Sequence, residues 1–183
     1  QTIYLFYGNT SATSQSNISI FNGPHSSTDS ITGGSAGGVA NCQRGFRFTV
    51  NEDVLIAQFG KNDPVGSEAR YVTLFDFNSQ AIVEQLQVSP GTINVYNYDN
   101  LGQPFWVKTG DEYILSLHSV TSGYYYGNST QIGQHFSYGD MRYCGNCNEN
   151  TYPTSVLTGM HYGYPDMLYY TKNNASSDPT SSV

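Results

Sequence analysis

Short runs in which apolar and polar residues alternate constrain the fold of this chain more than any other feature. In Gly45–Val50 (GFRFTV), the side chains of Phe46, Phe48 and Val50 share one face of an extended chain. The run Glu112–His118 (EYILSLH) alternates in the same way. A period of two places successive side chains on opposite sides of a β-strand. Both runs are therefore predicted to be half-buried strands.

Turn residues separate several more runs of this kind, at spacings near ten residues. Gly, Pro, Asn or Asp stands at most of the joints, and no stretch keeps a helical period for three turns. The further predicted strands are 3–7, 17–21, 54–59, 71–77, 81–88, 92–98 and 106–108, with 54–59 as the hairpin partner of 45–50. This spacing predicts an all-β fold: a single antiparallel β-sandwich or jelly roll with long loops and little helix, at most one short helical turn.

The length of 183 residues (20.1 kDa) suits one domain with one core. We expect a single β-sandwich domain over residues 1–172 and a Ser-, Thr- and Asn-rich linker or tail over 173–183. Within the domain, 1–44 holds the N-terminal strands and a Gly- and Ser-rich loop, 45–118 the central strands, and 119–172 a tyrosine-rich part.

Charged residues are scarce, at 11% against about 25% in an average soluble domain. The formal net charge is -7, and the seven Lys and Arg residues are scattered, so nucleic-acid binding is not expected. No apolar run reaches the roughly 18 residues of a membrane-spanning helix, so membrane insertion is not expected either. A surface of hydroxyls and amides, and a start at Gln1 that suggests a processed N-terminus, predict a secreted protein of the cell surface or matrix.

Cys42, Cys144 and Cys147 are candidates for disulfide formation. Three cysteines in a secreted chain predict one disulfide and one remaining thiol, which suggests intermolecular pairing. The C-x-x-C pair is expected to form a local bridge or to contribute one partner for Cys42, because no helix follows that would activate a redox thiol. Four N-x-[ST] sequons are candidates for glycosylation: Asn9, Asn17, Asn128 and Asn174.

No motif in the chain supports catalysis or a cofactor. Residues 33–37 match G-x-S-x-G, but their Ser- and Gly-rich flanks predict a loop rather than the strand and helix of a nucleophile elbow. The four histidines lack metal-ligand spacing, so no metal site is expected. The turn aspartates are compatible with a structural Ca²⁺, although no calcium-loop motif supports one. We expect a protein that is not an enzyme and has no cofactor.

The C-terminal third is rich in tyrosine, a residue whose rigid ring stacks on sugars and makes amphipathic protein contacts. Tandem tyrosines point to both faces of a strand, so core packing in a final hairpin and an exposed binding surface both remain open. The candidates for contact with a glycan or a protein are Tyr124, Tyr125, Tyr126, Tyr162 and Tyr164.

The first predicted strand is a candidate for self-association. It carries Ile3, Leu5 and Tyr7 on one side and is tethered to the centre by a Gly- and Ser-rich stretch. Such a strand pairs either with its own sheet or with the edge of a neighbouring copy.

Three segments carry a family resemblance: GFRFTV at 45–50, YVTLFDFNSQAIV at 71–83 and VKTGDEYILSLH at 107–118. They resemble secreted bacterial β-sandwich (jelly-roll-like) surface domains of unknown function that are associated with PEP-CTERM sorting. The resemblance covers about half of the chain, and its patterns are common to jelly rolls. It implies an extracellular, surface-associated role and no catalytic residue.

Together these features predict a non-catalytic structural or adhesive protein of the surface or matrix. Its partners would be copies of itself, in an oligomer or filament, or extracellular polysaccharide. One alternative is a carbohydrate-binding module that uses exposed tyrosines, and a lower-ranked one is a jelly-roll glycan hydrolase or lyase.

Overall fold

The computed structural model describes residues 21–28, 34–121 and 123–172, and over these ranges the chain is all-β with no helix. It therefore also contains no helix long and apolar enough to cross a membrane in these ranges. The strands are β1 (Phe21–Ser26), β2 (Ser35–Gly37), β3 (Cys42–Val50), β4 (Val54–Lys61), β5 (Arg70–Asp76), β6 (Ile82–Val88), β7 (Asn97–Val107), β8 (Glu112–Ser119), β9 (Tyr124–Gly127), β10 (Phe136–Gly145), β11 (Ser155–Leu157), β12 (His161–Tyr162) and β13 (Pro165–Lys172).

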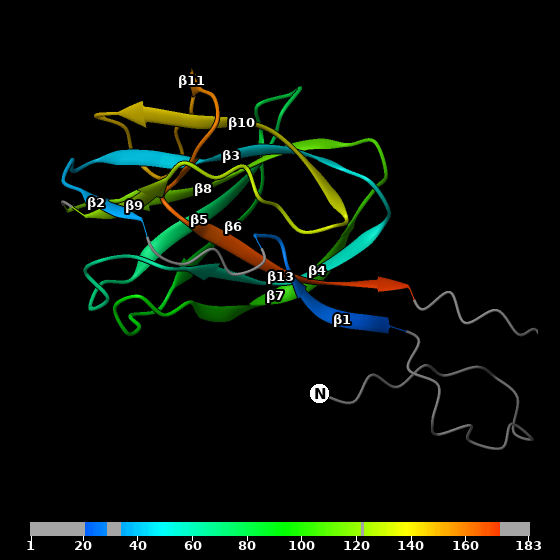
Figure 1. Ribbon diagram of the computed structural model, residues 1–183. Coiled ribbons are helices and arrows are strands. Elements are labelled where there is room, and N and C mark those ends of the chain that lie inside the picture. The colour runs from blue at the N-terminus through cyan, green and yellow to red at the C-terminus, as the bar shows by residue number, and fades with distance from the viewer. Residues whose placement is uncertain (1–20, 29–33, 122, 173–183) are drawn as a thin grey trace, which may run out of the picture.

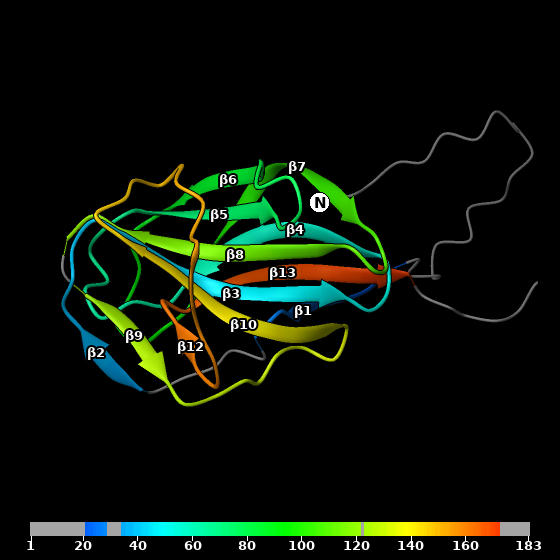
Figure 2. The same ribbon diagram turned by 90° about the horizontal axis from the view of Figure 1, so that it is seen from above.

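Two antiparallel sheets form the layers of a β-sandwich (Figures 1 and 2). One sheet has the strand order β11-β10-β3-β8-β5-β6, and the other has the order β1-β13-β4-β7. A third sheet, β12-β9-β2, lies at the end of the sandwich opposite the described chain ends, Phe21 and Lys172 (Figure 1). The expected sandwich fold is confirmed.

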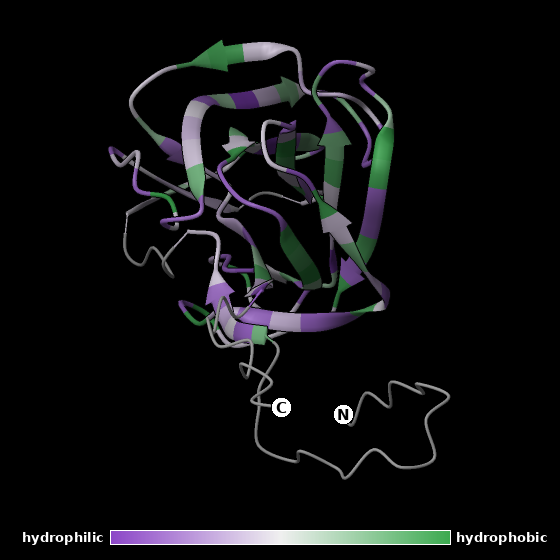
Figure 3. Ribbon diagram, turned by 90° about the vertical axis from the view of Figure 1, so that its right-hand side faces the viewer, coloured by the Kyte–Doolittle hydropathy of each residue, from purple (hydrophilic) through white to green (hydrophobic). Residues whose placement is uncertain are grey.

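The core lies between the two large sheets. The alternating residues predicted to face inward do so: Phe46, Phe48, Leu115 and Leu117 are fully buried. The four-stranded sheet contributes a matching set of buried side chains, namely Val54, Ile56, Phe59, Leu101, Val107, Met167 and Tyr169. Figure 3, which looks at the sandwich from one end, shows apolar segments on strands of both layers. Burial of these side chains from water drives the packing of the layers.

The predicted hairpin between residues 45–50 and 54–59 is wrong, because the two segments belong to different sheets. β3 pairs with β8 and β10, whereas β4 pairs with β7 and β13. The Asn51–Asp53 connection therefore carries the chain from one layer to the other. The strands before and after this connection both direct apolar residues into the core, so each of the two sheets has one apolar face.

Two other local predictions differ from the structure. Residues 92–96 form a turn rather than a strand, and β7 starts at Asn97 and continues unbroken to Val107. The segment expected as a loop over 22–39 contains most of β1 and all of β2. Ser35 of the G-x-S-x-G match is the first residue of β2, and a loop rather than a helix follows that strand.

Cys144 and Cys147 form a local disulfide, which is one of the two arrangements expected for these cysteines. It begins a strap, residues 144–152, that crosses the outer face of the six-stranded sheet. The main-chain oxygen of Glu149 accepts hydrogen bonds from Gln43 on β3, Thr73 on β5 and Gln85 on β6. The strap thus links β3, β5 and β6 through hydrogen bonds to this one main-chain oxygen. Cys42 is the free cysteine, and its buried thiol donates to Val39 O, so it is not exposed for an intermolecular bridge.

Several predicted features lie outside the described residues. These are the strand with Ile3, Leu5 and Tyr7, most of the strand at 17–21, and the sequons at Asn9, Asn17 and Asn174. Asn128 is described: it follows β9 and is exposed.

Candidate functional site: a groove on the outer face of the four-stranded sheet

The outer face of the four-stranded sheet carries a row of large apolar side chains. Leu55 on β4 pairs with Trp106 on β7 on one side and with Tyr170 on β13 on the other. Neighbouring residues at Val54 and Ile56 point into the core, so the alternation of the strand places Leu55 outward. Directly paired residues on one face lie close enough to pack against one another.

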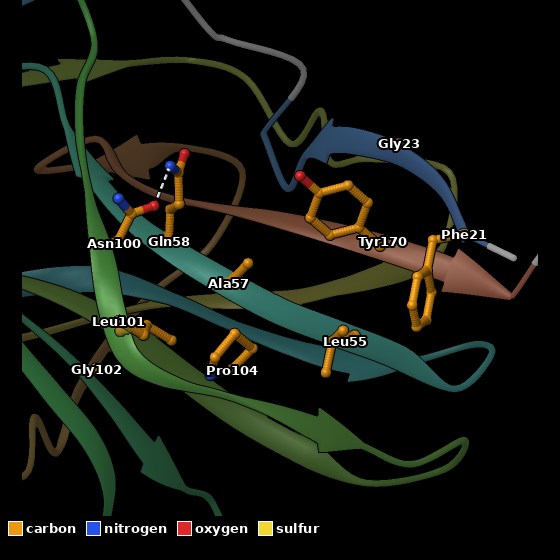
Figure 4. A pocket seen from close by; sticks show the side chains of 10 residues that line it. All are labelled: Phe21, Gly23, Leu55, Ala57, Gln58, Asn100, Leu101, Gly102, Pro104 and Tyr170. Atoms are coloured by element: carbon orange, nitrogen blue, oxygen red, sulfur yellow. Dashed lines mark hydrogen bonds between the residues drawn. The ribbon is translucent and has the colours of Figure 1, made fainter. Parts of the chain in front are cut away.

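A bulge in β7 hollows this face. Ile56 pairs with Phe105 and Gln58 pairs with Asn100, so two steps along β4 correspond to five along β7. The extra residues of β7 bow away from β4, as Figure 4 shows around Leu101 and Gly102. Pro104 lies in this stretch, where β7 is an edge strand and a missing N–H breaks no central ladder.

The resulting groove has a cavity volume of about 460 Å³ (Figure 4). At one end, Gln58 Nε2 donates a hydrogen bond of 2.7 Å to Asn100 Oδ1. The two amides hold each other in place and still keep free hydrogen-bonding capacity. The lining residues are Phe21, Gly23, Leu55, Ala57, Gln58, Asn100, Leu101, Gly102, Pro104 and Tyr170.

The rings of Phe21 and Tyr170 line the other end of the groove, and Trp106 with two lysine ammonium groups lies beside it. The ring of Phe21 lies 6.2 Å from that of Trp106 and 6.3 Å from that of Tyr170, so the three rings form one patch. Trp106 is 36% exposed. The Nζ atoms of Lys108 and Lys172 lie 5.6 and 5.2 Å from its ring centroid, within cation–π range.

A buried carboxylate fixes the wall of the groove. Asp166, at the start of β13, accepts hydrogen bonds from the hydroxyls of Ser26 and Ser27 and from their neighbour Thr28 N. Burial raises the pKa of the Asp166 carboxyl, and these donors oppose the rise. Because the contacts join the end of β1 to β13, they set the position of the strand that carries Phe21.

The five tyrosines expected to contact a ligand lie elsewhere, on the third sheet and beside it. The rings of Tyr124, Tyr126 and Tyr162 pack together with centroids 5.0–6.1 Å apart. The guanidinium of Arg44 lies 3.8 Å from the Tyr124 ring centroid. We call these four residues the tyrosine cluster.

Much of the ring surface of these tyrosines is covered. Tyr125 packs against Tyr164, and its hydroxyl bonds to the side chain of Asn94. Tyr124, Tyr125 and Tyr164 are all less than 9% exposed, whereas Tyr126 and Tyr162 are half-buried. The tyrosine cluster therefore brings together three of the five predicted tyrosines, and at most two of the five, Tyr126 and Tyr162, are open to a ligand.

Sequence reasoning missed the groove because its residues are dispersed over 21–23, 55–58, 100–106 and 170. Trp106 was a usable signal, since it is the single tryptophan of the chain and alternates with the half-buried Phe105 and the buried Val107, which pack in the core. Within the described ranges, no group of three or more His, Cys, Asp or Glu side chains is placed to hold a metal ion.

The amino-acid sequence matches no protein-family model and no curated protein.

Proposed function

We propose that the protein is a non-catalytic, extracellular adhesive module that binds polysaccharide through the aromatic groove. The observation that carries this proposal is the joint presence of aromatic rings and an amide pair in one open groove. Sugar rings present apolar faces that pack on aromatic side chains, and hydroxyls that pair with amides. Gln58 and Asn100 lie at one end of the groove and Tyr170 lies toward the other (Figure 4), where Trp106 flanks it beside Phe21 and Leu55.

The charge distribution favours a glycan that carries carboxylate or sulfate groups. The chain as a whole has a net charge of -7, yet two of its seven basic residues flank Trp106. Lys108 also pairs with Asp53 at 2.9 Å, so Lys172 supplies the less compensated charge at the groove. An anionic group beside Trp106 would meet one or both ammonium groups.

Binding of soluble polysaccharides, measured by isothermal titration calorimetry after a glycan array, tests the proposal. Trp106→Ala and Tyr170→Ala each remove a stacking ring, and we expect losses of about 1–2 kcal/mol, or roughly 5- to 30-fold in affinity. Lys172→Gln should weaken the binding of acidic glycans more than the binding of neutral ones.

Tyr126→Ala and Tyr162→Ala serve as matched controls, because they remove half-buried rings from the tyrosine cluster instead. If these two variants lose binding and the groove variants keep it, the groove is not the site and the tyrosine cluster takes its place. If no polysaccharide binds the folded protein, the proposed function is wrong.

Self-assembly through the edges of the six-stranded sheet is a second candidate function. β6 and β11 are the outer strands of this sheet in the described part of the chain, and each exposes two apolar side chains. These residues are Ile82 and Val83 on β6, and Val156 and Leu157 on β11. β11 contains no charged residue and β6 contains one, Glu84, so there is little charge on these edge strands to oppose pairing with other copies.

The sheet geometry allows such pairing to repeat. All neighbours in the sheet are antiparallel, so β6 and β11 run in opposite directions. β6 of one copy can therefore pair antiparallel with β11 of the next, which adds copies without closing a ring. Val83→Lys and Val156→Lys should each reduce the assembly mass measured by light scattering. Electron microscopy that finds only monomers of the wild-type protein at high concentration would rule this candidate out.

A further inference from the structure

A second cavity lies where the strap meets the end of β8, away from the groove. Its volume is about 480 Å³. Polar side chains dominate its lining, which consists of Asn41, His118, Val120, Asn146, Cys147, Asn148 and Glu149. Two of these groups, an imidazole and a carboxylate, are good ligands for a metal ion.

The hydrogen bonding of His118, which lines this cavity, determines which of its ring nitrogens has a free lone pair. Nε2 lies 3.0 Å from the main-chain oxygen of Cys147. A carbonyl oxygen only accepts hydrogen bonds, so Nε2 carries the hydrogen and, in the neutral ring, Nδ1 has a free lone pair. The side chain is 4% exposed, and Nδ1 is buried without a hydrogen-bond partner. A buried acceptor left unpaired costs about 1–3 kcal/mol, which indicates a missing partner.

Glu149 supplies a carboxylate oxygen, Oε2, at 3.9 Å from this Nδ1. The separation is too long for a hydrogen bond, and both atoms are acceptors when the ring is neutral. His135 shows the contrasting arrangement in the same protein. Its Nδ1 lies 2.7 Å from Glu52 Oε1, and its Nε2 lies 2.8 Å from Gln134 Nε2. The His118–Glu149 pair therefore has a gap that the His135–Glu52 pair lacks.

We propose that a divalent transition-metal cation of the Zn²⁺ type binds between His118 Nδ1 and Glu149 Oε2. Bond lengths of about 2.0–2.2 Å place two tetrahedral ligands roughly 3.3–3.5 Å apart. Glu149 is 30% exposed, so a small rotation of its side chain closes the difference. The Nε2–H contact to a main-chain carbonyl fixes the imidazole tautomer and orientation, as such contacts do for metal-ligating histidines.

Two protein ligands imply a site of moderate affinity, completed by water and by the exposed amides of Asn41 or Asn146. The imidazole nitrogen favours Zn²⁺, Cu²⁺ or Ni²⁺ over Ca²⁺ and Mg²⁺, which prefer all-oxygen sites. Binding would join the end of β8 to the strap beside the Cys144–Cys147 disulfide. This inference is independent of the proposed glycan binding.

Titration of the intact, disulfide-bonded chain with ZnCl₂, followed by calorimetry, tests the site. We expect one equivalent of Zn²⁺ to bind with a Kd of about 1–100 μM and CaCl₂ to produce no binding. His118→Gln and Glu149→Gln should each weaken Zn²⁺ binding at least 10-fold, and Zn²⁺ should raise the thermal midpoint of the wild-type protein but not of these two variants. His135→Gln is the matched control and should bind as the wild type does.

Glu149→Gln keeps the test decisive if His118→Gln fails to fold, because the Glu149 side chain is partly exposed and its main-chain contacts are retained. The inference is wrong if the wild type binds no Zn²⁺ below 1 mM. It is also wrong if Zn²⁺ binding survives both variants or is lost in His135→Gln. Nitrogen NMR that finds a hydrogen on His118 Nδ1 in the presence of excess Zn²⁺ would overturn it as well.

Discussion

Replacement of Asp166 by alanine tests how firmly β1 is held against β13. The buried carboxylate accepts six hydrogen bonds: from Ser26 Oγ, Ser27 N, Ser27 Oγ, Thr28 N, Tyr98 OH and Met167 N, at 2.5–3.1 Å. In the alanine variant the three hydroxyls can rotate toward other acceptors, but the main-chain N–H groups cannot. The loss of stability therefore depends on which other acceptors those N–H groups still contact.

Only some of these N–H groups are left without a good acceptor in the alanine variant. Ser27 N keeps a 3.0 Å contact with Met167 O, whereas Thr28 N and Met167 N keep only 3.2 Å contacts with serine hydroxyls. Two poorly satisfied buried donors cost about 2–6 kcal/mol together, and the removal of a buried charge offsets part of this cost, so we expect a net loss of about 2–4 kcal/mol. Asp166→Asn keeps one acceptor oxygen and should lose about 1–2 kcal/mol.

Urea unfolding, with fluorescence of Trp106 as the signal, measures these losses as shifts in the midpoint. Asp76→Ala is the matched control, because Asp76 accepts from Ser79 N and Ser79 Oγ in an exposed turn and should lose about 1 kcal/mol or less. A loss in Asp166→Ala no larger than in Asp76→Ala, at an unchanged m value, would refute the claim that this carboxylate anchors β1.

Three further predictions concern a buried histidine, two buried arginines and the disulfide. Burial lowers the pKa of His161 from 6.5 to about 4, so between these pH values only the unfolded state gains a proton. Up to about 3 kcal/mol of stability should therefore be lost as pH falls from 6.5 to 4, and urea unfolding of His161→Gln should lack this loss. Arg44→Met loses a cation–π contact with Tyr124 but removes two buried nitrogens without a hydrogen-bond partner, so it should cost only about 1–2 kcal/mol. Arg70→Met should cost about 3 kcal/mol or more, because Arg70 bonds to Ser119 Oγ and Gly123 O and pairs with the buried Asp63; equal losses in thermal scans would contradict this. Because the Cys144–Cys147 bridge closes a short loop, the double variant Cys144→Ser, Cys147→Ser should lose only about 2 kcal/mol of stability in urea unfolding. A double variant that is completely unfolded would show that the bridge does more than limit the entropy of the unfolded chain.

The strands that could be predicted from the sequence are those with one face packed against the core and the other face outside it. β3 and β8 pair with each other in the middle of the six-stranded sheet, so the alternation of Phe46 and Phe48, or of Leu115 and Leu117, reports directly on the core. The 92–98 prediction failed because its apolar residues Ile93 and Val95 lie exposed in a turn. Asn94 adopts φ 64° there, which interrupts an extended strand.

The groove was beyond sequence reasoning because it depends on which strands become neighbours. Tyr170 and Trp106 reach one face only because β13 and β7 both pair with β4, and no local pattern specifies that choice. The tyrosine prediction relied instead on abundance. Abundance does not separate Tyr125, which packs against Tyr164, from Tyr170, which lines an open groove.

The position of β13 has a consequence for how the chain folds as it is synthesised. This last strand lies inside its sheet, between β1 and β4, and Ser26 pairs with Leu168 across almost the whole described sequence. A ribosome adds about 5–20 residues per second from the N-terminus, so β1 and β4 wait several seconds for the strand that joins them. Contacts this distant in sequence also make closure slow. A product that ends before Pro165 therefore lacks Tyr170 and the strand that joins β1 to β4, so the proposed glycan binding requires the whole of β13.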